Sequence, residues 1–312
     1  MKTAETISIS GNKKNKSAVE WIAQIVFTIC ASFTILAVLS ILVYMFLNGT
    51  PALFKVGIKE ILLETVWKPT AAEPQYGIFY VILTSIVGTF LAVLIGVPIG
   101  LLTAVFLAEA APKRLAAVVK PAIELLAGIP SVIYGLLGIM ILNPLMYKLE
   151  LYLFKDSWTH QFTGGANLLS AVLVLAIMIL PTVINMSETA IRAVHPSLKS
   201  SSLALGATHM QTIFHVILPA AKSGILAAVM LGVGRAIGEA MAITLVSGSS
   251  VNLPLPFNSV RFLTTALVSE MGYASDTHRE VLFTIGLILF VFIMTINIVM
   301  EKWIKKGGNE DA

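Results

Sequence analysis

The chain has 312 residues, of which 57% are apolar and 12% charged, and its formal net charge is +4. Soluble globular domains carry about 25% charged residues, so this composition excludes a soluble enzyme and a disordered chain. The single cysteine, Cys30, and five scattered histidines provide neither a disulfide framework nor a cluster of metal ligands. We therefore expect no metal site and no catalytic site in this chain.

Six long apolar blocks follow one another along the sequence, and a bilayer crossing needs about 20 such residues. They lie at about residues 21–47, 77–107, 113–147, 168–186, 223–246 and 281–303. The first block is about twice as long as the apolar core of a signal peptide, so we expect it to be retained as a membrane helix. The pattern predicts an all-α integral membrane protein with six transmembrane helices.

These blocks divide the chain into segments. They are a leader (1–20), the first transmembrane helix (21–47), an outer loop (48–76), a five-helix core (77–303) that contains a long loop (187–222), and a tail (304–312). Cytoplasmic segments carry an excess of Lys and Arg. Placing both termini and the long loop in the cytoplasm leaves thirteen basic residues inside and seven outside. We therefore expect both termini to be cytoplasmic.

The loop between the fourth and fifth blocks has the most specific pattern. Gly206 lies between two helix-like stretches, and nine residues separate it from Val216-Ile217-Leu218-Pro219. A glycine permits a sharp turn, and a proline is tolerated in the first turn of the following helix. Taken alone, these features also fit an ordinary helical hairpin between two spans.

The spacing resembles the cytoplasmic loop of ABC-importer permeases, in which Glu-Ala-Ala is followed by three residues, Gly, nine residues and Ile-x-Leu-Pro. Here Ser200, Ser201 and Ser202 stand in place of Glu-Ala-Ala, so the usual glutamate is missing. The resemblance implies a type I ABC importer permease-like core whose loop docks on a separate ATPase. Since the sequence has no Gly-Lys-Ser/Thr phosphate loop, we expect no cofactor here and ATP bound by the partner.

Two further segments narrow the resemblance, namely LLAGIPSVIYGLLG at 125–138 and LGVGRAIGEAMA at 231–242. They are similar to the phosphate-importer permeases of the Pst system, and the second resembles the PstC-type subunit more than the PstA type. The resemblance implies phosphate import across a bacterial-type cytoplasmic membrane. The implied partners are a PstA-type permease, two ATPase subunits, an extracytoplasmic phosphate-binding protein, phosphate and the lipid bilayer, with no nucleic acid.

Arg235 and Glu239 are the charged pair inside the fifth block. Arg235 lies about 12 residues into a helix from Ser223, or about 18 Å, near the bilayer midplane. Glu239 is the fourth residue after it, a spacing that predicts one helical face and an ion pair. A charge at this depth usually marks a pathway, and guanidinium suits phosphate. A purely structural pair is the alternative. Glu239 would hold Arg235 in position or accept a phosphate proton, and we favour the first.

Glycines and one proline are expected to shape the spans. Gly232 belongs to a stripe of small residues that lets another helix approach closely, and Gly234 and Gly238 are assigned to packing with it. Gly128 and Pro130 should break the third block, as a kink or as backbone that faces a cavity.

Two other transport functions remain open from the sequence, whereas a membrane-embedded enzyme is disfavoured because the sequence places no metal-ligand cluster or nucleophile–base pair together. One is a permease for a different oxyanion in the same superfamily. The other is a secondary anion carrier that works without ATP. The spacing of the loop argues against the carrier, because a docking loop has no purpose without an ATPase.

Overall fold

The computed structural model describes residues 13–158 and 160–308. Most of the predicted leader and the last four residues of the predicted tail therefore lie outside the described residues. The chain divides into two units, Met1–Asn48 and Gly49–Ala312. In the first unit the described part is a single helix, α1, which runs Lys13–Ala52 and so extends beyond the predicted 21–47 range.

The described chain is almost entirely helical, as the sequence predicts. Its long helices after α1 are α3 (Phe79–Val105), α7 (Leu168–Arg192), α11 (Lys222–Gly238) and α14 (Asp276–Gly308). Its short helices are α2 (Ile58–Leu63), α4 (Lys113–Gly128), α5 (Ser131–Leu137), α6 (Asn143–Leu153), α8 (Pro196–Ala204), α9 (His209–Thr212), α10 (Leu218–Ala220), α12 (Met241–Val246) and α13 (Leu263–Glu270).

Short π-helical segments and one small sheet complete the secondary structure. The π-helical segments are η1 (Leu53–Gly57), η2 (Phe106–Ala110), η3 (Gly138–Leu142) and η4 (Ile213–Ile217). Strands β1 (Trp67–Lys68) and β2 (Gln75–Tyr76) form an antiparallel pair, with Trp67 opposite Tyr76. The predicted outer loop 48–76 therefore contains this hairpin as well as α2.

Six crossings can be counted in order along the described residues. Five helical stretches are long and apolar enough on their own: Glu20–Leu63, Phe79–Ala110, Ser131–Leu153, Leu168–Arg192 and Asp276–Lys302. A sixth results if His209–Ala220 and Lys222–Gly238, which meet at an angle of 70°, count as one bent crossing. The third crossing begins only after the break at Gly128, since the amphipathic α4 precedes it.

Close packing of α3 on α7 forms the centre of the second unit. Every fourth residue on one face of α3 is small and buried: Gly88, Ala92, Gly96, Gly100 and Ala104. A Cβ atom at Gly96 would lie 2.7 Å from Ile179, and one at Gly100 would lie 2.9 Å from Val183. Small residues let two backbones approach this closely, so this face of α3 fixes the position of α7.

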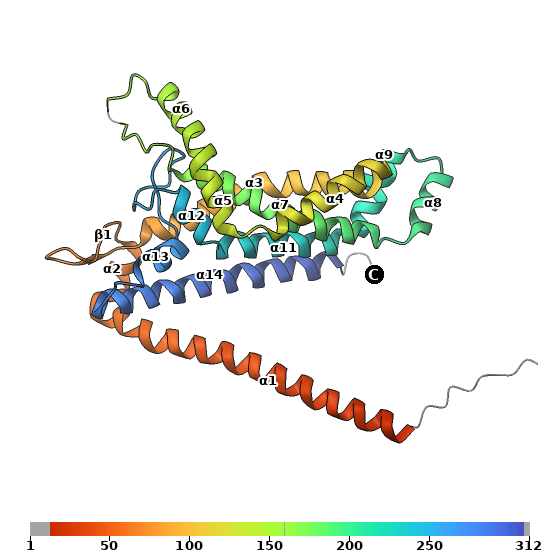
Figure 1. The fold of residues 1–312 in the computed structure, drawn as a ribbon, viewed down its shortest axis with the longest axis horizontal. Helices are drawn as coiled ribbons and strands as arrows, with labels where there is room; N and C mark the ends of the chain where they lie inside the picture. The colour runs from red at the N-terminus through yellow and green to blue at the C-terminus, as the bar shows by residue number, and fades with distance from the viewer. Residues whose placement is uncertain (1–12, 159, 309–312) are drawn as a thin grey trace, which may run out of the picture. The chain divides into compact units, whose positions relative to one another are not determined.

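The second unit has two distinct ends (Figure 1). Helices α2, α12 and α13, the β1–β2 hairpin and α6 gather at one, which we call the α13 end. Helices α8 and α9 lie at the other, which we call the α8 end (Figure 1). The long helices α3, α7, α11 and α14 run between them. The two ends therefore correspond to opposite ends of the membrane crossings.

Candidate functional site

The fifth crossing breaks at Glu239. Helix α11 ends at Gly238, and Glu239 has an extended backbone with φ −72° and ψ 130° before α12 begins at Met241. Two contacts satisfy polar groups at this break. The Glu239 carboxylate accepts a hydrogen bond from the Ala242 N–H at 2.9 Å, and its carbonyl accepts one from the Thr264 hydroxyl at 2.7 Å.

This break makes the predicted ion pair between Arg235 and Glu239 wrong. Residues four apart share a face only in a continuous helix, and the helix ends between these two. Among the described residues, Arg235 makes no hydrogen bond or ion pair. The Glu239 carboxylate instead accepts a hydrogen bond at the start of α12, so it does not hold the Arg235 guanidinium in position.

Arg235 lines an open groove of about 650 Å³ formed by three helices. Its polar lining consists of Thr182 from α7, Arg235 from α11 and Asn297 from α14. The other lining residues are apolar: Ala227, Met230, Leu231 and Gly234. No carboxylate belongs to the lining, so the one charge that the described residues place there is a cation. Such a groove suits an anion, because guanidinium presents several N–H donors to oxygen.

Sequence reasoning missed two of these groove residues. Thr182 follows Pro181 in a helix that reads as apolar, and Asn297 is an isolated amide in the last block. Asn297 could have been noticed, since a polar side chain inside a crossing is expected to face protein or water. The proximity of Asn297 to Arg235 could not have been predicted, because the two residues are 62 positions apart in the sequence.

The three glycines assigned to packing in the fifth block behave differently. A Cβ at Gly232 would lie 2.8 Å from Val183, so Gly232 lies directly against α7. Gly234 and Gly238 have no atom within 4 Å of a Cβ position in the described chain. Gly234 lines the groove instead, and Gly238 ends α11. Only Gly232 of the three therefore packs another helix closely within this chain.

The break between α4 and α5 lies at Gly128 and Pro130. Helix α4 ends at Gly128, Ile129 is extended with φ −70° and ψ 126°, and Pro130 precedes α5. Proline disfavours a helical conformation in the residue before it. The Tyr134 hydroxyl donates a 2.7 Å hydrogen bond to the Leu126 carbonyl, which gives a partner to a carbonyl at the end of α4.

The loop 187–222 forms a helical hairpin with an exposed tip. Gly206 has φ +88° and follows α8, and no atom lies within 4 Å of its Cβ position. Leu205 beside it is 89% exposed. Glycine is required here by its backbone conformation and not by a close approach. The tip thus leaves an apolar side chain exposed.

The remaining predicted loop residues occupy different parts of this hairpin. Ser200 and Ser201 are exposed on α8, whereas Ser202 Oγ lies 2.9 Å from Thr212 Oγ1 and joins α8 to α9. Leu218 and Pro219 form α10, directly before the 70° bend into α11. Ser202 therefore serves the hairpin itself, and the Ser200 hydroxyl donates to the Ser197 carbonyl within α8 at 3.0 Å.

A buried carboxylate fixes the base of this hairpin. Glu188, 4% exposed, lies 2.8 Å from Lys120 Nζ on α4 and accepts a 2.7 Å hydrogen bond from Arg192 Nε. Arg192 also donates from Nη2 to the Leu107 carbonyl in η2, at 2.7 Å. One carboxylate therefore ties the ends of α3, α4 and α7 together at the α8 end.

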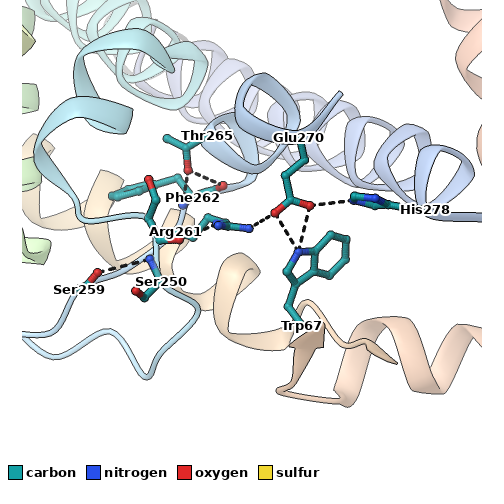
Figure 2. Close-up of polar contacts among 9 residues, drawn as sticks. Trp67, Ser250, Ser259, Arg261, Phe262, Thr265, Glu270 and His278 are labelled. Atoms are coloured by element: carbon teal, nitrogen blue, oxygen red, sulfur yellow. Dashed lines mark hydrogen bonds and ion pairs between the residues drawn. The ribbon is translucent and has the colours of Figure 1, made fainter. Parts of the chain in front are cut away.

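A second buried carboxylate organises the α13 end (Figure 2). Glu270, 4% exposed, pairs with Arg261 and lies 2.7 Å from His278 Nε2. The Trp67 Nε1–H donates to both of its oxygens at 3.1 Å. Burial raises the pKa of the nearby Tyr273 phenol, with Glu270 adding to the rise and Arg261 opposing it. This network links the β1–β2 hairpin, the segment before α13, and α14.

Comparison with known proteins gives a consistent result. Residues 96–306 match the family described as binding-protein-dependent transport system inner membrane component. The chain is 35% identical over 311 residues to the probable ABC transporter permease protein YqgH of Bacillus subtilis, covering 96% of this chain and 97% of that protein. It is 32% identical over 319 residues to the phosphate transport system permease protein PstC of Xylella fastidiosa, covering 98% of each.

Solved structures are similar in fold. A bacterial alginate ABC transporter in complex with an alginate-bound periplasmic protein matches with a TM-score of 0.64 and 13% identity, over 92% of this chain and 94% of that one. A bacterial ABC transporter that imports alginate matches with a TM-score of 0.62 and 17% identity, over 94% and 98%. At these identities the likeness concerns the fold alone.

Proposed function

The chain belongs to the family of binding-protein-dependent transport system inner membrane components, and on that premise we propose that it is the permease subunit of an ATP-driven importer of inorganic phosphate. Its fold is that of type I ABC importer permeases. Relatives that match nearly the whole chain are named as PstC permeases of phosphate transport systems. Family membership also argues against a secondary carrier that works without ATP.

Arg235 carries the proposal within this chain. Its guanidinium is half-buried in a membrane crossing, has no hydrogen-bond or ion-pair partner among the described residues, and faces an open groove without a carboxylate. A cation at such depth costs at least ~2.5 kcal/mol on insertion scales. A passing oxyanion would supply the partner that this cation lacks, since guanidinium and phosphate form paired charge-assisted hydrogen bonds.

The complete transporter requires partners. We infer a PstA-type second permease, two ATPase subunits and an extracytoplasmic phosphate-binding protein. The groove beside Arg235 is open on one side, which suits a path that a second permease closes. The exposed Leu205 tip of the hairpin 187–222 suits an ATPase groove. In this arrangement the α8 end and both termini face the cytoplasm, and the α13 end faces the binding protein.

Uptake of ³²P-phosphate tests this function. In a host that lacks its own phosphate permeases, the chain expressed with its three kinds of partner should restore uptake. Arg235→Gln should lower the rate at least about tenfold at unchanged membrane abundance, because a hydrogen bond to a charged group contributes about 1.5–3 kcal/mol. Restored uptake of sulfate or molybdate without phosphate would instead favour a permease for another oxyanion.

A further inference from the structure

Three polar side chains that line the groove have one property in common. Thr182, Arg235 and Asn297 all lie in membrane crossings, and none has a hydrogen-bond partner among the described residues. They come from three helices, α7, α11 and α14, and converge on one cavity of about 650 Å³. A polar group inside a crossing is costly unless water, protein or a ligand satisfies it.

Two other threonines on the same helices are satisfied within their own helix. On α7, the Thr189 hydroxyl donates to the Asn185 carbonyl at 2.8 Å. On α14, the Thr295 hydroxyl donates to the Val291 carbonyl at 2.8 Å. This bond to the preceding turn is the ordinary solution for threonine in a membrane helix. Thr182 does not adopt it, so its hydroxyl remains available to the groove.

The donors available in the groove match an oxyanion. Arg235 offers guanidinium N–H groups, Asn297 an amide NH₂, and Thr182 a hydroxyl. The amide oxygen and the hydroxyl also accept hydrogen bonds, so both tolerate the proton that phosphate retains near neutral pH. The lining has no carboxylate to repel the anion, since Glu239 is held at Ala242.

We propose that Thr182 and Asn297 complete, with Arg235, a three-point binding step for inorganic phosphate in the translocation path. The proposal rests on the proposed function and adds two specificity-determining residues to it. Arg235 supplies the charge, while the two neutral side chains orient the anion. The groove forms one wall of the path, and the second permease forms the other.

Isosteric variants of the complete transporter test this step in proteoliposomes that contain the binding protein and external ³²P-phosphate. Thr182→Val and Asn297→Leu should each lower uptake about tenfold, because each removes one hydrogen bond to a charged ligand. Thr182→Ser keeps the hydroxyl and should stay within about twofold of wild type. Thr189→Val and Thr295→Val are matched controls on the same two helices and should also stay within about twofold.

The outcomes separate this inference from the function on which it rests. Uptake within twofold of wild type in both Thr182→Val and Asn297→Leu, while Arg235→Gln abolishes it, overturns the three-point step alone. Equal loss in Thr182→Ser and Thr182→Val also overturns it, because the hydroxyl would then not be the active group. Failure of the wild-type complex to import phosphate overturns the proposed function instead.

Discussion

The carboxylate of Glu239 and the N–H of Ala242 are joined by a 2.9 Å hydrogen bond at the start of α12. The N-cap residue of α12 is Ala240, which has no side-chain acceptor, and the carboxylate of the preceding Glu239 instead supplies a partner for an N–H of the first turn. The acid that lies nearest Arg235 in the sequence therefore has a structural task of its own. Glu239 and Arg235 therefore have different roles, one structural and one proposed in transport, and substitutions at each residue can distinguish these roles.

Substitutions at Glu239 should affect stability more than transport chemistry. Glu239→Gln keeps an oxygen that can accept from Ala242, so phosphate uptake should remain within a few-fold of wild type. Glu239→Leu removes the acceptor for the Ala242 N–H and should destabilise the purified complex by about 0.5–2 kcal/mol, as loss of a side-chain acceptor at a helix start does. Thermal denaturation and uptake, measured on the same preparations, check both. Loss of uptake in Glu239→Gln as severe as in Arg235→Gln would mean that the negative charge itself acts in transport.

Gly206 should tolerate asparagine better than valine. Its φ of +88° suits glycine, and asparagine visits this region more readily than other residues do. A β-branched residue there costs about 1–3 kcal/mol of strain, so Gly206→Val should reshape the exposed tip and weaken ATPase docking. Because the space around Gly206 is open, a steric clash with neighbouring residues would not explain an effect of Gly206→Val. The measurement is the amount of ATPase that copurifies with the permease; unchanged copurification in Gly206→Val would contradict the prediction.

Breaking the Glu270 network should be costly. Glu270→Leu leaves Arg261, which is largely buried, without its carboxylate, and an unpaired buried charge destabilises by about 3–5 kcal/mol. Trp67→Phe removes only the indole donor and should cost about 1 kcal/mol. Chemical or thermal denaturation of the purified transporter ranks the two variants. An equal loss of stability in the two variants would show that the Glu270–Arg261 ion pair contributes little to the free energy of unfolding.

Membrane orientation can be read from single cysteines. In a Cys30→Ser background, Ser197→Cys in α8 and Glu73→Cys in the β1–β2 hairpin both place a thiol at an exposed position. An impermeant maleimide added to intact cells should label Glu73→Cys, and should label Ser197→Cys only after permeabilisation, as the distribution of basic residues predicts. Labelling of Ser197→Cys in intact cells would reverse the orientation.

The sequence predicts the crossings well because their signal is local. Each crossing needs only a long apolar run. Five of the six runs overlap a helical stretch that is long and apolar enough to cross, and the run 223–246 forms α11 and α12 with a break at Glu239. Prolines are harder to interpret. Pro130 ends a helix as expected, whereas α3 continues through Pro98 and α7 through Pro181. Tertiary packing decides these cases, since α3 and α7 stabilise each other along much of their length.

The geometry around Arg235 could not be predicted, because distant residues determine it. The spacing of Arg235 and Glu239 indicates one helical face, but the helix ends between them. The Thr264 hydroxyl, 25 residues away, supplies a partner for the Glu239 carbonyl at the break. The groove likewise depends on Asn297, whose position next to Arg235 follows from the packing of α14 on α11.

The interlocked face of α3 and α7 limits how the permease can change shape. Val183 and Ile179 occupy the hollows left by Gly100 and Gly96, and neither helix can slide along the other without a collision of side chain and backbone. We therefore expect the two helices to move as one rigid body during a transport cycle. We expect any hinge to lie elsewhere, at the interruptions of the regular helix at Ile129, Ala221 and Glu239.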